Sequence, residues 1–158
     1  MIRVAPASPN HPDAQRLLAR LSETLEALTG SSGTQSFDAA EVQDPRGLFV
    51  LAHDSEGRAV GCGAVRPLSP DIGEVKRVFA DSDGGRGIGS AIMDHLEGAA
   101  GALGYRALWL ETRQINARAR RFYERRGYRV IANFGRYRGR EEAVCFGKSL
   151  EQLASEDD

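Results

Sequence analysis

Several features are scarce in this sequence of 158 residues, and each shortage excludes a class of protein. An excess of one charge is missing, because 21 basic residues stand against 22 acidic ones and the net charge is −1. The overall charge therefore indicates neither a nucleic acid nor a membrane surface as partner. No apolar run approaches the roughly 20 residues of a membrane-spanning helix, and the first residues lack the apolar segment of a signal peptide. We expect a cytoplasmic protein with no membrane partner.

Cysteine and histidine are also rare. The two cysteines, Cys62 and Cys145, each lie in an apolar, strand-like run. This placement favours buried reduced thiols, although the sequence leaves a disulfide open. The three histidines, His11, His53 and His95, are scattered and lack the spacing of metal ligands. We therefore expect no metal site.

Hydrophobic periodicity and turn residues divide the chain into a series of elements. A helix is predicted from a cap at Asn10 or Asp13 to about Leu28. Further helices are predicted at residues 38–43, 87–103 and 116–126, and strands at 2–5, 47–54, 58–68, 72–80, 105–112, 128–133 and 142–150. This order indicates a mixed α/β sheet in one domain, residues 1–150. The acidic residues 151–158 are expected to be disordered.

The stretch DGGRGIG, from Asp83 to Gly89, places four glycines directly before a predicted helix. The first turn of a helix has unpaired N–H groups and a dipole that favours anions, and glycines let a phosphate come close. The pattern therefore predicts a cradle for a diphosphate. Its candidate residues are Gly85, Arg86, Gly87, Ile88, Gly89 and Ser90.

The same glycines fit two further phosphate-binding motifs less well. A P-loop is disfavoured because no lysine follows Gly89. A dinucleotide fingerprint would need Gly or Ala where Ser90 stands and would lie near the start of its domain, although Glu111 could serve as its ribose-binding acid. A plain strand-to-helix connector is the structural alternative.

The stretches EVKRVFADSDGGRGIGSAI and NARARRFYERRGYR resemble two motifs of the GNAT superfamily of N-acetyltransferases. The second stretch has the form N-x-x-A-x-x-x-Y-E-x-x-G-[FY], carried by Asn116, Ala119, Tyr123, Glu124, Gly127 and Tyr128. The stretches GCGAVRPL, NFGRY and VCFGKSL also resemble a bacterial branch of small-molecule-type GNAT proteins. The resemblance covers about residues 2–150. It implies the GNAT fold, an α/β (α+β) architecture with a mixed, mostly antiparallel central sheet of six to seven strands flanked by helices.

The resemblance also implies acetyl-CoA as co-substrate, without a metal. One position departs from the family pattern, since Gly84 stands where Arg or Gln is usual, and Arg86 is the candidate replacement donor. The backbone of Val78, Phe79 and Ala80 would then pair with the pantetheine arm. By the same resemblance, Asn116 would contact the cofactor while capping its helix.

For catalysis, the resemblance implies direct attack of an amine on the acetyl thioester. Tyr123 is the candidate acid that protonates the CoA thiolate, and Glu74 is the candidate base, acting through a water. From the residues alone, two structural alternatives stay open. Tyr123 could be a packed helix aromatic, and Glu74 could be a solvated strand residue paired with Lys76.

Ten arginines and one acidic residue, Glu124, lie between Arg113 and Arg140. This stretch could be a solvated helix face, a rim for CoA phosphates or an anionic substrate, or an RNA surface; the last is least favoured without interleaved aromatics. We expect an N-acetyltransferase acting on a small-molecule amine, anionic if the arginines mark its site, with a homodimer as a further option. The alternative is a non-catalytic CoA- or nucleotide-binding regulatory module.

Overall fold

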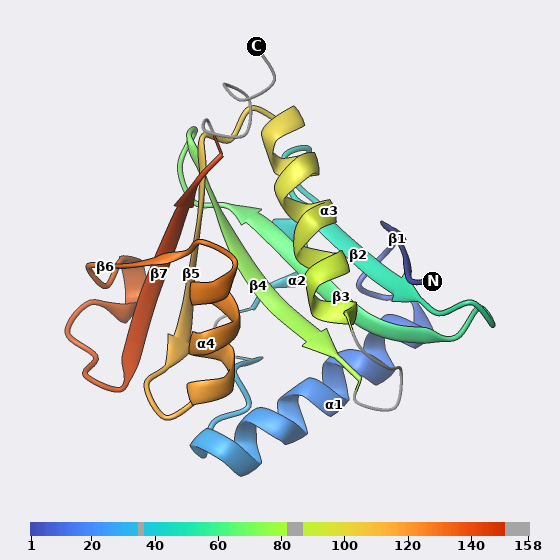
Figure 1. Ribbon diagram of the computed structural model, residues 1–158, viewed down its shortest axis with the longest axis horizontal. Helices are drawn as coiled ribbons and strands as arrows, with labels where there is room; N and C mark the ends of the chain where they lie inside the picture. The colour runs from blue at the N-terminus through green and yellow to red at the C-terminus, as the bar shows by residue number, and fades with distance from the viewer. Residues whose placement is uncertain (35–36, 82–86, 151–158) are drawn as a thin grey trace.

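A seven-stranded sheet forms the centre of the protein, as Figure 1 shows for a computed structural model that describes residues 1–34, 37–81 and 87–150. The strands are β1 (Arg3–Pro6), β2 (Leu48–His53), β3 (Ala59–Pro67), β4 (Ile72–Ala80), β5 (Ala107–Arg113), β6 (Arg129–Ile131) and β7 (Ala143–Ser149). Their order across the sheet is β1-β2-β3-β4-β5-β7-β6. Only β4 and β5 run parallel, and every other neighbouring pair is antiparallel. The predicted element order and the mixed, mostly antiparallel sheet are both confirmed.

Helices cover both faces of this sheet (Figure 1). One face carries α3 (Ile88–Ala102) and α4 (Ala117–Arg125), and the other carries α1 (Pro12–Thr29) and the short α2 (Ala39–Val42). The predicted cap of α1 was wrong: His11 occupies the position, and its Nδ1 accepts a hydrogen bond from the Asp13 N–H at 3.1 Å. Pro12 opens the helix, where its missing N–H leaves no bond unmade.

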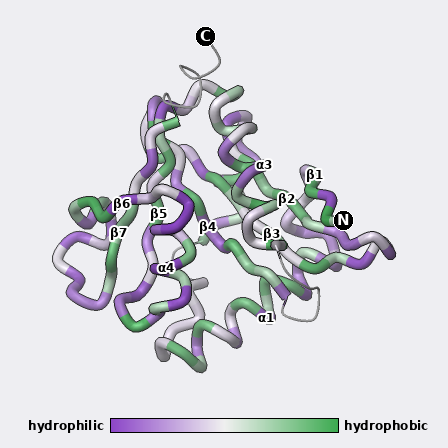
Figure 2. The backbone as a smooth tube through the Cα atoms, viewed as in Figure 1, coloured by the Kyte–Doolittle hydropathy of each residue, from purple (hydrophilic) through white to green (hydrophobic). Residues whose placement is uncertain are grey.

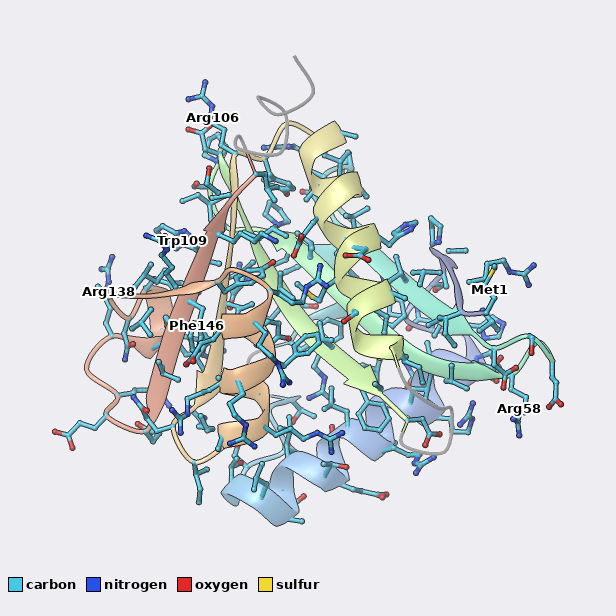
Figure 3. All side chains as sticks on the ribbon, viewed as in Figure 1. Met1, Arg58, Arg106, Trp109, Arg138 and Phe146 are labelled. Atoms are coloured by element: carbon cyan, nitrogen blue, oxygen red, sulfur yellow. The ribbon has the colours of Figure 1, made fainter. Side chains whose placement is uncertain are left out.

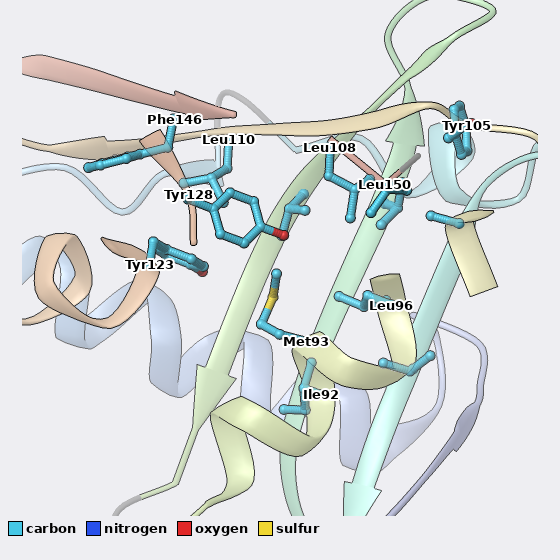
Figure 4. Close-up of a cluster of buried hydrophobic side chains, with 14 of the residues drawn as sticks. Ile92, Met93, Leu96, Tyr105, Leu108, Leu110, Tyr123, Tyr128, Phe146 and Leu150 are labelled. Atoms are coloured by element: carbon cyan, nitrogen blue, oxygen red, sulfur yellow. The ribbon is translucent and has the colours of Figure 1, made fainter. Parts of the chain in front are cut away.

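Separate apolar clusters fill the two faces. The larger one lies under α3 and includes Ile92, Met93, Leu96 and Phe146, all fully buried (Figure 4). α3 lies close to β3 because β3 offers glycines there: a Cβ on Gly61 would come within 2.7 Å of the Ile88 side chain. Figure 2 shows α4 as largely hydrophilic by comparison, so its position depends on the few apolar side chains on its inner face.

The predicted free thiols are confirmed, since Cys62 and Cys145 are buried and neither is in a disulfide. Burial raises the pKa of the Cys62 thiol to about 12, which keeps it protonated and unreactive. Among the described helices, none is both long and apolar enough to cross a membrane. The predicted tail, residues 151–158, lies outside the described residues.

Candidate active site

In the middle of the sheet, the neighbouring strands β4 and β5 pair over a short stretch and then diverge. These parallel strands pair at three positions only, Ile72 with Ala107, Gly73 with Leu108 and Glu74 with Trp109. Beyond this point β5 stays paired with β7 as far as Arg113, whereas β4 continues to Ala80 with a partner on its β3 side only, within the described residues. The two strands diverge in Figure 1. One edge of β4 is therefore free to pair with an extended ligand.

A β-bulge lies on β4 next to this free edge. Cys62 pairs with Phe79 but Ala64 pairs with Lys76, so β4 contains one more residue than β3 over this interval. Arg77, in the bulge, is the single non-glycine with a positive φ (54°) in the described part of the chain. Its guanidinium donates to the carbonyls of Leu18 and Ser32, which anchor the bulge to α1 and the segment after it. Bulges commonly re-aim a strand beside a functional site.

Glu74 is buried at the point where β4 and β5 part, with 1% of its surface exposed. Arg66 pairs with Oε1 (2.7 Å from Nη2), while Oε2 accepts a hydrogen bond from the Tyr137 hydroxyl (3.0 Å) and lies 3.4 Å from Lys76 Nζ. The alternative of a solvated strand residue is therefore wrong, although the pairing with Lys76 holds. Arg66 also reaches Glu41 of α2 at 2.7 Å.

Of the neighbours of Glu74, the sequence identified Lys76 as a partner, gave Glu111 another role and did not indicate Tyr137. Tyr137 belongs to a single turn of 3-10 helix, η3 (Gly135–Tyr137), in a stretch predicted to be a loop. Burial lowers the pKa of the Lys76 amine. Burial also raises the pKa of the Glu111 carboxyl, which pairs with Arg113 at 3.1 Å. Glu111 was predicted only as a ribose ligand, and the antiparallel pairs of this sheet are unlike the doubly wound sheet of that alternative.

α3 begins beside the free end of β4, and the described part of the predicted glycine-rich stretch starts at its cap. Gly87 is its N-terminal cap at φ 81°, and a Cβ there would meet no atom within 4 Å. The first helical bond is donated by the Ala91 N–H to the Gly87 carbonyl (3.0 Å), so the N–H groups of Ile88, Gly89 and Ser90 precede the helical ladder. Gly85 and Arg86 of the predicted cradle lie outside the described residues, as does Gly84, the position that departs from the family pattern.

α4 carries Tyr123 and places the residue before it against the start of α3. That residue, Phe122, lies 3.3 Å from the position that a Cβ on Gly89 would take. The Tyr123 ring packs edge-on against Phe122 and Tyr128, with centroids 5.0 and 5.6 Å away, and projects from α4 into the cluster of Figure 4. Burial raises the pKa of the Tyr123 phenol, so it stays protonated at neutral pH. Tyr123 is thus a packed aromatic that also carries a protonated donor.

Asn116 caps α4 as the sequence predicts, because its Oδ1 accepts a hydrogen bond from the Ala119 N–H at 3.1 Å. The last turn is fixed to α3: Arg126 pairs with Asp94 at 2.7 Å, and the Tyr128 hydroxyl donates to buried Glu97 at 2.9 Å. This polar contact sets α4, and with it Tyr123, relative to the first turn of α3.

The arginine-rich stretch is mostly exposed. Arg118, Arg121, Arg125 and Arg129, which the helical spacing placed on one solvated face, are largely outside the core. Exposed arginines continue through the segment between β6 and β7, where the side chain of Arg138 extends away from the sheet (Figure 3). Arg113 and Arg126 differ, since each is partly buried in an ion pair.

Comparisons of the sequence with known proteins agree on one family. A sequence profile described as the acetyltransferase (GNAT) family matches residues 14–128. The chain is 31% identical over 139 residues to an IAA acetyltransferase of Azospirillum brasilense, covering 86% of this chain and 90% of that protein.

Solved structures agree with this match. A Klebsiella pneumoniae protein assigned as an acyl-CoA N-acyltransferase superposes with a TM-score of 0.80 at 26% identity, over 95% of this chain and 98% of that one. A GNAT family acetyltransferase from Elizabethkingia anophelis, with acetyl-CoA bound, gives a TM-score of 0.68 at 17% identity, over 94% and 97%. At that identity the likeness concerns the fold.

Proposed function

Because the chain belongs to the acetyltransferase (GNAT) family, we propose that it transfers the acetyl group of acetyl-CoA to a primary amine of a small molecule by direct attack. The observation that carries this proposal is the divergence of β4 and β5 beside the N-terminus of α3. Phe122 of α4 packs at that first turn, and the protonated Tyr123 packs against Phe122. An extended thioester, its diphosphate and its leaving thiolate each have a chemically suitable partner in this arrangement.

Acetyl-CoA binding is assigned to backbone groups. The free edge of β4 at Val78, Phe79 and Ala80 would pair with the amides of the pantetheine arm, and an N–H there would polarise the thioester carbonyl. The N–H groups from Gly87 to Ser90 would hold the diphosphate at the positive end of the α3 dipole. Gly85 and Arg86 complete this cradle in the proposal, and Asn116 fixes the start of α4 beside it.

Two proton transfers complete the reaction. An amine with an ordinary pKa near 10.4 must lose a proton before attack, and we assign this to Glu74 through a water. The Tyr123 hydroxyl then donates to the departing thiolate. Because α3 and α4 cover one face of the sheet, the amine would approach Glu74 from the opposite face, which carries α1 and α2 and where Tyr137 of η3 contacts Glu74. We call this the acceptor face.

An anionic acceptor suits the surrounding charge. The exposed arginines of α4 lie on the face opposite the acceptor face, whereas Arg136, Arg138 and Arg140, also exposed, lie in the segment between β6 and β7 that carries η3 at the acceptor face. Their positive potential attracts amines that also carry a carboxylate or phosphate and repels polycations. We therefore propose amino acids and related anionic amines as the acceptor class.

A screen of amines tests the proposal. The purified protein is incubated with acetyl-CoA and one amine at a time, from amino acids, amino sugars, aryl amines and polyamines. CoA release is followed with a thiol reagent, and the acetylated amine is identified by mass spectrometry. We expect equal amounts of both products with an anionic amine. Binding of acetyl-CoA by calorimetry without product from any amine would instead support the regulatory CoA-binding module.

A further inference from the structure

Three buried polar side chains meet on the acceptor face, at the end of the β4–β5 pairing. The Tyr137 hydroxyl donates to Glu74 Oε2 at 3.0 Å and accepts a hydrogen bond from Lys76 Nζ at 3.0 Å, and Lys76 Nζ lies 3.4 Å from the same carboxylate oxygen. All three residues are at most 7% exposed. Glu74 and Lys76 belong to β4, whereas Tyr137 comes from the connection between β6 and β7. The hydrogen bonds of Tyr137 therefore connect β4 to the β6–β7 connection across the place where β4 and β5 diverge.

The segment that carries Tyr137 is itself pinned in place. The Asn133 side-chain amide lies within hydrogen-bond distance of the carbonyls of Tyr137 (3.2 Å), Arg140 (3.0 Å) and Ala143 (3.4 Å). The Tyr137 ring packs edge-on against Phe134, which packs against Trp109 of β5. A hydroxyl held from several sides can fix the orientation of its acceptor.

We propose that Tyr137 is a positioning residue for acetyl transfer: with Lys76 it holds the Glu74 carboxylate in a fixed orientation at the acceptor face. Hydrogen bonds to a carboxylate favour its charged form, and a nearby cation does the same. The inference deepens the proposed function and rests on it, because Glu74 is the base assigned there. Tyr137 itself transfers no proton to the substrate.

Several other charged groups act on the same carboxylate. Arg66 of β3 pairs with Oε1 and is itself balanced by Glu41 of α2. Glu111 of β5 also interacts with Glu74 and is itself flanked by Arg113 and by Glu142, just before β7. The uncharged Cys145 thiol of β7 lies near both carboxylates. None of these side chains is replaced in the Tyr137 variant, so a change in its pH profile can be assigned to the loss of the Tyr137 hydroxyl. Lys76 also acts on Glu111, so the Lys76 variant supports that assignment without making it alone.

The test compares Tyr137→Phe with Tyr105→Phe, using the amine found in the screen. Tyr105 is also buried, and its hydroxyl donates a hydrogen bond to the Arg46 carbonyl (2.7 Å). Replacing Tyr105 by Phe therefore removes one buried hydroxyl hydrogen bond, as Tyr137→Phe does, but the acceptor is a carbonyl instead of a carboxylate. The readout is kcat/KM against pH. We expect the acid limb of the Tyr137→Phe profile to move up by about one pH unit. The limb of Tyr105→Phe should coincide with the wild type.

Two further variants keep the inference testable if Tyr137→Phe fails to fold. Lys76→Met removes the ammonium at similar length and should move the acid limb in the same direction. Asn133→Ala loosens the segment without touching Glu74 and should cause a smaller shift of the same sign. A wild-type enzyme that is active while Tyr137→Phe keeps its pH profile would overturn the inference alone. A wild type that acetylates no amine would overturn the proposed function and this inference with it.

Discussion

The two glycines at the ends of α3 offer a matched test of the cofactor site. Gly87 caps the N-terminus at φ 81°, and Gly104 follows the C-terminus at φ 96°. A Cβ on Gly87 would meet no atom within 4 Å, and one on Gly104 would meet only Arg46 at an ordinary 3.8 Å. The helix between them has 15 residues, about 22 Å of length. Replacement of either glycine by alanine therefore strains the backbone alike, but only one lies at the proposed diphosphate cradle.

The magnitudes follow from this geometry. An alanine in a left-handed conformation costs about 1–2 kcal/mol, and about 2–4 °C of Tm accompanies each kcal/mol in a domain of this size. Both variants should lose about 2–8 °C. If Gly87→Ala also disturbs one hydrogen bond to a charged phosphate, worth about 1.5–3 kcal/mol, its Kd for acetyl-CoA should rise about 10- to 100-fold. Gly104→Ala should bind as the wild type does.

Calorimetric titration with acetyl-CoA and a thermal melt of each variant measure the two quantities separately. Gly87→Asp adds a negative charge at the same place and should bind more weakly than Gly87→Ala. The assignment of the cradle is refuted if Gly87→Ala binds acetyl-CoA with wild-type affinity. It is equally refuted if Gly104→Ala loses as much affinity, because the loss would then reflect strain in α3 alone.

Three further predictions concern the base, the thiols and the surface of α3. Glu74→Gln should lower kcat/KM most below the pKa of the acceptor amine, with the loss shrinking as pH rises; a loss that is constant across the pH profile would indicate positioning instead of base catalysis. Cys62, whose thiol pKa burial raises to about 12, should resist iodoacetamide at pH 8 until the protein unfolds, and rapid alkylation of the folded protein would contradict its burial. Since the unfolded thiol ionises near 9.0, the free energy of unfolding should also fall as pH rises above about 9. Gly98→Ala, at an exposed helix position with no atom within 4 Å of the new Cβ, should raise Tm through about 0.5–1 kcal/mol of backbone entropy, and a lower Tm would disprove that the site is open.

The elements of the fold could be predicted because their signals are local. The periodicity of IGEVKRVFA matches β4 (Ile72–Ala80) residue for residue, and Gly127 at φ 91° follows α4 as a glycine should. The bulge could not be predicted, since the pattern of β4 is regular and the register with β3 is decided only when the strands pair. Arg77 shows no sign in the sequence that it adopts a positive φ.

The candidate site was predictable only in part, for the same reason. Tyr123 and Asn116 belong to a contiguous motif, so one helix positions both. The surroundings of Glu74 come from distant parts of the chain: Tyr137 is 63 positions away and Glu41 is held through Arg66. Contacts between residues this far apart depend on where β4 and β5 diverge and on the β6–β7 connection lying across that place. Neither feature produces a recognisable pattern within one segment of the sequence.

The central claim is that acetyl transfer takes place between β4 and β5 with Tyr123 as the proton donor. The most direct measurement is the single-turnover rate of Tyr123→Phe, with enzyme in excess over acetyl-CoA and the acceptor amine saturating, so that product release does not enter. We predict a rate about 10²–10⁴-fold below the wild type, with the Kd for acetyl-CoA unchanged. A single-turnover rate equal to that of the wild type would contradict the claim.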